Sequence, residues 1–420
     1  MQRALPHPSD VVRRARHSER RPSSPHPSVD SLGIVSRISQ RIAAINESAT
    51  LKVDAKAKAL KAQGRDVISY AAGEPDFPTP ANVVEAASRA VLDPASHRYT
   101  PAVGLPDLRE AIAAKTLRDS GTAVDASQVV VTNGGKQAVY QAFQAVVNPG
   151  DEVLLPDPSY PCNRHFVAAA GGQAVLLPAG AESRFQLDTA AVQAAWNPRT
   201  RGVLLASPSN PTGTSIAPDE MGRIVQAVRE RNGFAIVDEI YLGLSYDDQF
   251  AASALQFGED VISINSFSKY FSMTGWRLGW MVLPERLVAP VERLAQNLFI
   301  CASSVAQQAA LACFTPEAIA TYEDRRTAFR ARRDFIVPAL QQLGFGVPVV
   351  PDGAFYVWCD VSAHASSSWD FCFDMMHKAH VALTPGRDFG PQAGERFMRL
   401  SFANSLPQLQ EAVRRLSQAL

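Results

Sequence analysis

Short apolar runs alternate along the chain with longer segments whose apolar residues recur at helical spacing. The runs show no alternation of apolar and polar positions, which is typical of strands that are covered on both faces. Such strands occur in parallel sheets packed between helices, so the pattern predicts an α/β fold with a mainly parallel sheet sandwiched by helices. The expected strands are residues 129–132, 153–155, 174–177, 202–206, 234–237, 261–265 and 278–283, and the helices among them include residues 134–147, 218–231 and one that begins near Pro161.

A different pattern flanks this region on both sides. After about Pro284, helical patterns over residues 288–299 and 315–343 are followed by a stretch of mixed strands and helices. Near the start, the Ala- and Lys-rich residues 52–61 predict a helix that Gly64 ends as a C-cap. We therefore expect a large domain and a smaller α+β domain built from both chain ends. The large domain covers residues 80–300, and the smaller one covers residues 34–79 and 301–420.

The first 33 residues show neither pattern. Five arginines fall between residues 13 and 21, and a Pro- and Ser-rich stretch follows them. Such a composition cannot bury enough apolar surface to become ordered. The stretch has no apolar core of a secretory signal, and Asp10, Glu19 and Asp30 count against an organellar transit peptide. We expect either a disordered leader over residues 1–33 or a start that is assigned too far upstream.

Composition and charge exclude several classes of protein. The 41 Lys and Arg residues balance 41 Asp and Glu residues, so no net charge points to nucleic acid or anionic lipid as a partner. No apolar run approaches the roughly 18 residues that a membrane span needs. The five cysteines form no C-x-x-C pair, which favours buried thiols in a reducing compartment over disulfides or a zinc site. We expect a globular cytoplasmic protein without a metal site.

Two motifs follow expected strands at the edge where open parallel sheets bind ligands. Residues 132–137 (TNGGKQ) combine two glycines with the start of a helix, which suits a phosphate, although a plain turn explains the same pattern. Residues 207–213 (SPSNPTG) place prolines on both sides of Ser209 and Asn210. This arrangement holds the Asn210 amide in a rigid loop, and a purely structural turn is the alternative.

Two further motifs carry ionisable groups at the ends of expected strands. Asp238 ends a buried strand, where an ionised carboxylate needs a cation such as a protonated ring nitrogen; N-capping of a helix is the alternative. Lys269 follows another strand between hydroxyl groups and shortly before Arg277. This pattern indicates an amine that reacts with aldehydes beside an anion site, or a surface lysine in a turn.

Taken together, the motifs resemble those of the class I and II aminotransferases, which are fold type I enzymes of pyridoxal 5′-phosphate. The resemblance runs from about Arg37 to the C-terminus and rests on seven motifs in the family's order. They are Gly73-Glu74-Pro75, Tyr99 with Gly104, Gly134-Gly135-Lys136-Gln137, Asn210-Pro211-Thr212-Gly213, Asp238-Glu239-Ile240-Tyr241, Ser266-x-Ser268-Lys269 and Arg399.

The resemblance implies a role for each matching residue around the cofactor. Lys269 binds the cofactor covalently and moves a proton between substrate and cofactor. Asp238 keeps the ring nitrogen protonated, while Asn210 and Tyr241 contact the phenolic oxygen. Tyr160 stacks on the ring, where many relatives have a tryptophan. The implied phosphate ligands are Gly135, Lys136, Ser266, Ser268, Arg277 and, from a neighbouring subunit, Tyr99, which implies a homodimer with shared active sites.

The resemblance also implies a substrate class. Arg399 matches the arginine that binds the α-carboxylate, next to Asn210 and Gly73. Lys136 matches a lysine that binds a distal carboxylate in one bacterial subgroup, and the stretch around Thr79 is typical of that subgroup. We therefore expect ping-pong exchange of an amino group between an L-amino acid, with aspartate as a candidate, and a 2-oxo acid such as 2-oxoglutarate.

Other functions remain open at this point. Alanine, aromatic amino acids and prephenate are alternative substrates, and C–S bond cleavage is an alternative reaction of the same cofactor. A non-enzymatic regulator is disfavoured, because binding alone does not need Lys269. We interpret two remaining clusters as structural. His377 and His380 lack the partners of a metal site, and the arginines at 325, 326, 330, 332 and 333 read as the exposed face of a helix.

Overall fold

The computed structural model describes residues 38, 39, 43, 45, 47–392 and 394–420. The expected leader, residues 1–33, lies outside these described residues. Residues 44–420 form one compact unit, and the fold below is that of its described part. The helix expected near the start is α2 (Ala49–Ala62), and Gly64 follows its end with a φ of 82°. No helix of the described residues is long and apolar enough to cross a membrane.

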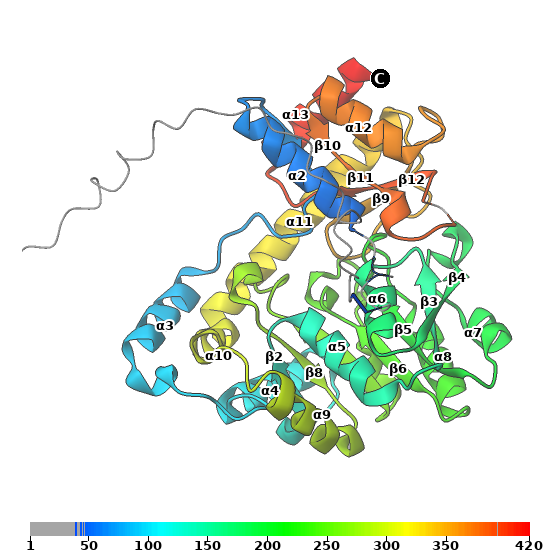
Figure 1. The fold of residues 1–420 in the computed structure, drawn as a ribbon. Coiled ribbons are helices and arrows are strands. Elements are labelled where there is room, and N and C mark those ends of the chain that lie inside the picture. Colours follow the sequence, from blue (N-terminus) through cyan, green and yellow to red (C-terminus); the bar gives the residue numbers. More distant parts are fainter. Residues whose placement is uncertain (1–37, 40–42, 44, 46, 393) are drawn as a thin grey trace, which may run out of the picture. The chain divides into compact units, whose positions relative to one another are not determined.

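A seven-stranded sheet is the centre of this unit, in the order β2-β8-β7-β6-β5-β3-β4 (Figure 1). Every pair of neighbours is parallel except the two pairs formed by β8, which confirms the mainly parallel sheet. The carboxyl ends of the other six strands therefore share one edge. The strands are β2 (Val129–Thr132), β3 (Glu152–Asp157), β4 (Gln173–Pro178), β5 (Thr200–Ala206), β6 (Phe234–Asp238), β7 (Val261–Ser266) and β8 (Gly279–Val282).

Helices cover both faces of this sheet, which explains why its strands are continuous apolar runs. Leu204 and Ile236 face one core, where they pack with residues of α5 (Gly135–Val146). Their neighbours Val203 and Val237 face the opposite core, together with residues of α8 (Pro218–Arg229). Because successive side chains of a strand point to opposite faces, a strand between two cores favours apolar residues at successive positions. Also around the sheet are α4 (Pro106–Ser120), α6 (Cys162–Ala169), α7 (Thr189–Ala195) and α9 (Glu285–Leu298).

Two small sheets contain the remaining strands. β12 (Phe397–Ser401) lies between β11 (Thr384–Pro385) and β9 (Tyr356–Asp360) in an antiparallel sheet. β1 (Ile68–Ser69) pairs in parallel with β10 (Val381–Ala382), so segments from both chain ends lie side by side. This pairing supports a smaller domain from both ends, while the boundaries at 79/80 and 300/301 stay a prediction. The helices here include α12 (Ser368–Lys378) and α13 (Leu406–Ala419).

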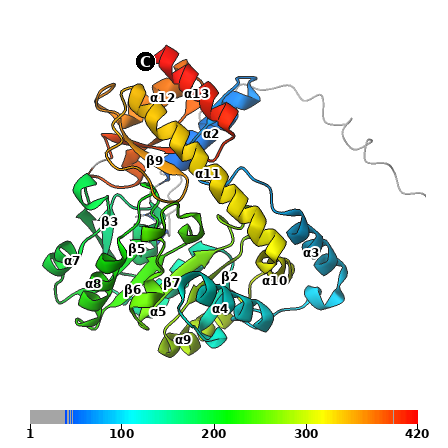
Figure 2. The same cartoon turned by 180° about the vertical axis from the view of Figure 1, so that it is seen from behind.

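The long helix α11 (Pro316–Gln342) extends from the region of the seven-stranded sheet to the small sheets (Figure 2). It follows α10 (Ser304–Leu311), which packs on α3 (Ala81–Leu92). The prediction that all five of its arginines form an exposed face is wrong. Of the five, only Arg330 is exposed, Arg325, Arg326 and Arg333 are half-buried, and Arg332 is buried. That residue is 7% exposed, and its guanidinium donates two hydrogen bonds, of 2.7 and 3.0 Å, to the carboxylate of Asp76.

Candidate active site

Lys269 lies in a tight turn directly after β7. Ser266, the last residue of that strand, stabilises the turn, because its hydroxyl accepts a hydrogen bond of 3.0 Å from the Ser268 backbone N–H. The Lys269 amine donates a hydrogen bond to the carbonyl oxygen of Gly73. Burial, with the nearby Arg399 cation, lowers the pKa of Lys269 from 10.5 to about 8. About a tenth of the amine is therefore unprotonated at pH 7, far more than for an ordinary lysine, and able to act as a nucleophile.

Asp238 ends β6, the strand next to β7. Burial raises its pKa from 3.8 to about 7, although the Ile240 backbone N–H donates a hydrogen bond of 3.2 Å to the carboxylate. None of the salt bridges in the described part of the chain includes Asp238. A carboxylate that is poorly solvated and forms no salt bridge favours a ligand that supplies a cation.

Tyr241 follows β6 and meets a residue that we did not predict from the sequence. Its hydroxyl lies 2.7 Å from the hydroxyl of Tyr356, the first residue of β9. Both rings are buried, which raises both pKa values, so both phenols stay protonated. A Cβ atom added at Gly73 would lie 2.8 Å from the Tyr356 hydroxyl, which explains the glycine there. No local pattern marks Tyr356, because its neighbour Tyr241 is 115 residues away.

Arg399 lies in the middle of β12 and is 3% exposed. Its guanidinium donates hydrogen bonds to the Asn210 side-chain oxygen (2.8 Å) and to the Ala71 carbonyl (2.7 Å), while its Nε has no hydrogen-bond partner. No salt bridge of the described residues includes this buried cation. A guanidinium with neutral partners and an unused N–H group suits an incoming carboxylate, which it can bind with two hydrogen bonds.

The start of α5 lies close to residues around β7 and β8. Gly134 has a φ of 86°, and a Cβ atom there would lie 2.5 Å from the Arg277 guanidinium. A Cβ atom at Gly135 would be 3.5 Å from the side chain of Ser266. Two glycines, the Ser266 hydroxyl, the Arg277 guanidinium and the start of a helix thus lie close together. This set of donors suits a phosphate.

Three predicted residues differ in how closely they join this cluster. Lys136 is exposed, and its ammonium lies 5.6 Å from the ring centre of Tyr160, which is half-buried after β3. Tyr99 does not join the others, since its side chain is 79% exposed. None of the hydrogen bonds or ring contacts found in the described residues links it to the predicted site. Tyr99 is therefore available to contact a second copy of the chain.

The donor set has the chemistry that pyridoxal phosphate requires. Asp238 offers an anion to a ring cation, Lys269 offers an amine to an aldehyde, and the start of α5 offers donors to a phosphate. Within the described residues, no group of three His, Cys, Asp or Glu residues could hold a metal ion. The amine of Lys269, the carboxylate of Asp238 and the residues at the start of α5 fit this organic cofactor.

Comparisons with known proteins agree with this chemistry. The family "Aminotransferase class I and II" matches residues 65–416. An aspartate aminotransferase of Streptomyces avermitilis is 41% identical over 397 residues, covering 91% of this chain and 96% of the relative. A valine–pyruvate aminotransferase of Mycobacterium tuberculosis is 39% identical over 352 residues, covering 84% of this chain and 90% of the relative. The crystal structure of Thermus thermophilus aspartate aminotransferase with maleate superposes with a TM-score of 0.86, at 36% identity, covering 91% of this chain and 99% of that one.

Proposed function

The chain belongs to the class I and II aminotransferases, which are pyridoxal phosphate-dependent enzymes, and we propose that its site exchanges an amino group between an L-amino acid and a 2-oxo acid by a ping-pong route. The observation that carries this proposal is the position of the Lys269 amine. It is desolvated and lies near Asp238 and Arg399, which both influence its pKa. An amine, an anion for a ring cation and a cation for a carboxylate are the three groups that transamination needs.

The cofactor, when bound, supplies the electron sink that stabilises a carbanion at the substrate α-carbon. We propose that Asp238 keeps its ring nitrogen protonated, because no salt bridge of the described residues includes this buried carboxylate. Tyr241 and Asn210 would donate hydrogen bonds to the phenolic oxygen, and Tyr160 would cover one face of the ring. The proposed phosphate ligands are Gly135, Lys136, Ser266, Ser268 and Arg277, together with Tyr99 of a second copy of the chain in a homodimer.

The released Lys269 amine is the proposed acid and base for the substrate. A pKa of about 8 suits both roles, because the amine can accept a proton from the α-carbon and return it at neutral pH. Arg399 would bind the α-carboxylate and so orient the bond to be broken. Gly73 lies next to the Lys269 amine, since its carbonyl oxygen accepts the hydrogen bond of Lys269.

A dicarboxylic substrate pair, aspartate and 2-oxoglutarate, is the proposed specificity. Lys136 is exposed at the site, and its ammonium is free to bind a distal carboxylate beside the Tyr160 ring. The two relatives named above differ in this respect, because one is an aspartate enzyme and the other a valine–pyruvate enzyme. Alanine, aromatic and prephenate substrates therefore belong in the test. The cytoplasmic location stays a prediction.

The test is a panel of donors and acceptors with the purified, cofactor-loaded protein. L-aspartate alone should change the cofactor absorption, and 2-oxoglutarate should then restore it with one equivalent of glutamate. Lys269→Ala should abolish this exchange without unfolding the protein. Pyruvate and ammonia from cysteine-type donors, without glutamate, would instead identify a C–S lyase. Restoration only by pyruvate or by aromatic 2-oxo acids would overturn the dicarboxylic specificity.

A further inference from the structure

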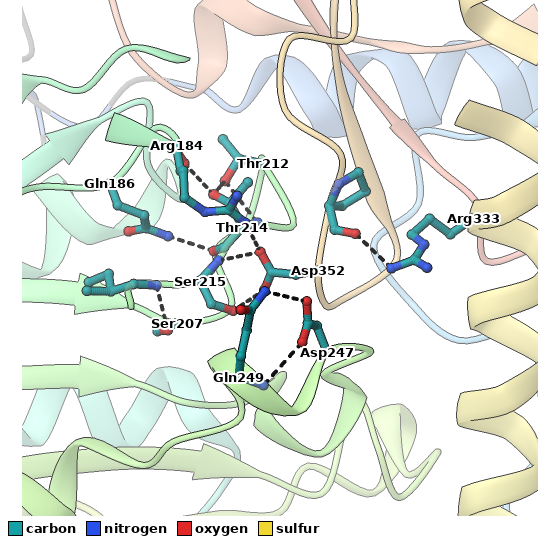
Figure 3. A network of polar contacts seen from close by, with 12 residues as sticks. Arg184, Gln186, Ser207, Thr212, Thr214, Ser215, Asp247, Gln249, Arg333 and Asp352 are labelled. Atoms are coloured by element: carbon teal, nitrogen blue, oxygen red, sulfur yellow. Dashed lines mark hydrogen bonds and ion pairs between the residues drawn. The ribbon is translucent and has the colours of Figure 1, made fainter. Parts of the chain in front are cut away.

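Two segments that are far apart in the sequence pack tightly beside the site. Residues 207–215 follow β5 and carry Asn210, while residues 350–355 lead into β9 (Figure 3). The backbone N–H groups of Asp352 and Gly353 both donate to the carbonyl of Gly213, at 3.0 and 2.9 Å. A Cβ atom on Gly213 would lie 2.6 Å from Pro351, so only glycine allows this approach. The two segments are therefore joined backbone to backbone.

The side chain of Asp352 adds a buried anion to this junction. Asp352 is 5% exposed, and its carboxylate accepts hydrogen bonds from the Ser215 backbone N–H (3.1 Å) and from the Ser215 hydroxyl. Arg184 forms a 2.5 Å ion pair with the same carboxylate and keeps 35% of its own side chain exposed. We call these contacts, with the two backbone bonds to Gly213, the Asp352 clamp. All donors to the carboxylate come from outside residues 350–355, so it ties that segment to its surroundings (Figure 3).

The clamp acts on the turn that holds Asn210. The turn is closed by two hydrogen bonds of 2.9 Å, from the Ser209 N–H to the Thr214 carbonyl and from the Gly213 N–H to the Ser209 carbonyl. Asn210 lies inside it, between the residues that make these bonds. The clamp holds Gly213 and Ser215, on the far side of the same turn. A shift of those two residues therefore moves the Asn210 amide.

The other end of the clamp is linked to Arg399. Residues 350–355 continue into β9, whose Trp358 is paired with Arg399 of β12. Asn210 in turn accepts the 2.8 Å hydrogen bond from the Arg399 guanidinium. The Asp352 clamp thus connects the seven-stranded sheet, which carries Asn210, to the three-stranded sheet, which carries Arg399. It closes a loop of contacts around the proposed carboxylate site.

We propose that Asp352 is a positioning residue that holds Asn210 against Arg399, so that the substrate α-carboxylate meets a preformed pair of groups. The inference rests on the proposed function, because it gives the pair a substrate. Preformed donors bind more tightly than mobile ones, since no ordering cost falls on the binding step. A buried carboxylate that only stabilised the fold would not act on carboxylate binding through Asn210.

The test compares Asp352→Asn, which keeps the shape but removes the charge, with Ser215→Ala, which removes one donor to the clamp. Asp260→Asn is the matched control, because Asp260 also pairs with an arginine, Arg286, but its side chain is 37% exposed and it lies just before the start of β7, at the edge of the sheet opposite the site. The first measurement is the distance between Asn210 and Arg399 in crystal structures of the variants. The second is the dissociation constant of maleate, a dicarboxylate probe, for the cofactor-loaded protein with and without Asn210→Ala.

We expect the bond between Asn210 and Arg399 to be lost in both clamp variants and maleate to bind about tenfold more weakly. In the Asn210→Ala background, the same substitutions should change maleate binding by less than about twofold. Asp260→Asn should leave both measurements unchanged. A bond that persists at 2.8 Å, or an equal loss of maleate affinity in both backgrounds, would overturn the proposal. If the wild-type protein shows no transamination, the proposed function fails, while the distance still tests the role of the clamp.

Discussion

Replacing Arg399 by lysine keeps the positive charge but removes the planar fork. In the structure the guanidinium already gives one N–H to Asn210 (2.8 Å) and one to Ala71 (2.7 Å), and it lies 4.5 Å from the ring centre of Tyr356. An ammonium group cannot keep both bonds and also bind a carboxylate with two hydrogen bonds. The variant should therefore lose at least one charged hydrogen bond to the substrate. Such a bond contributes about 1.5–3 kcal/mol, which corresponds to a fall in kcat/KM of about 10- to 150-fold.

The assay separates the α-carboxylate from the rest of the substrate. We would measure the amino-group half-reaction with L-aspartate and with β-alanine, which keeps the distal carboxylate but has no α-carboxylate. Arg399→Lys should reduce the reaction with aspartate by the factor above and change that with β-alanine by less than about twofold. Equal losses with both amines, or no loss with aspartate, would refute the assignment of Arg399 to the α-carboxylate.

Four other predictions follow from contacts and pKa values of the site and its support. Tyr356→Phe removes the partner that lies 2.7 Å from the Tyr241 hydroxyl. It should lower the free energy of unfolding in denaturant by about 1 kcal/mol and shift the pH midpoint of the cofactor absorption. An unchanged midpoint would exclude an effect of Tyr356 on the cofactor through Tyr241. Folding raises the pKa of Asp238 to about 7, so the cofactor-free native state binds more protons than the unfolded state between about pH 4 and 7. The contribution of Asp238 to the free energy of unfolding should therefore fall as the pH rises through that window. Asp238→Asn should remove this part of the pH dependence in urea titrations. Folding lowers the pKa of Lys269 to about 8, so its contribution to the free energy of unfolding should rise between about pH 8 and 10.5. This pH dependence should vanish in Lys269→Met. The same pH dependence in that variant would contradict the desolvation of the amine. Arg332→Ala should lower the free energy of unfolding by about 2 kcal/mol, because it leaves Asp76 without its partner. Arg330→Ala, on the exposed side of α11, should lower it by less than about 0.5 kcal/mol. Equal effects of the two substitutions would refute the difference in burial.

The sequence alone was enough for the strands of the seven-stranded sheet and for the motifs at their ends. A strand between two cores is apolar on both faces, so Val129–Thr132 and Phe234–Asp238, each with one polar residue at its carboxyl end, can be recognised without knowledge of their neighbours. The carboxyl ends of parallel strands share one edge, so Asp238 and Lys269 were expected together before any contact was known. Their order along the chain also indicated the family. These features are local, and local patterns are visible in a single chain.

Contacts between distant segments were decided only by the tertiary structure. Three features depend on contacts between segments that are more than 100 residues apart along the chain. They are the strand order with β8 antiparallel, the Tyr241–Tyr356 pair and the Asp352 clamp. Arg332 shows the same limit of sequence patterns. Its position in the helix indicates an exposed face, but its guanidinium is buried in an ion pair with Asp76, 256 residues away. A sequence pattern reports the spacing of neighbours along one element. Which side chains meet across elements depends on how the elements pack, and that packing sets the geometry of the site.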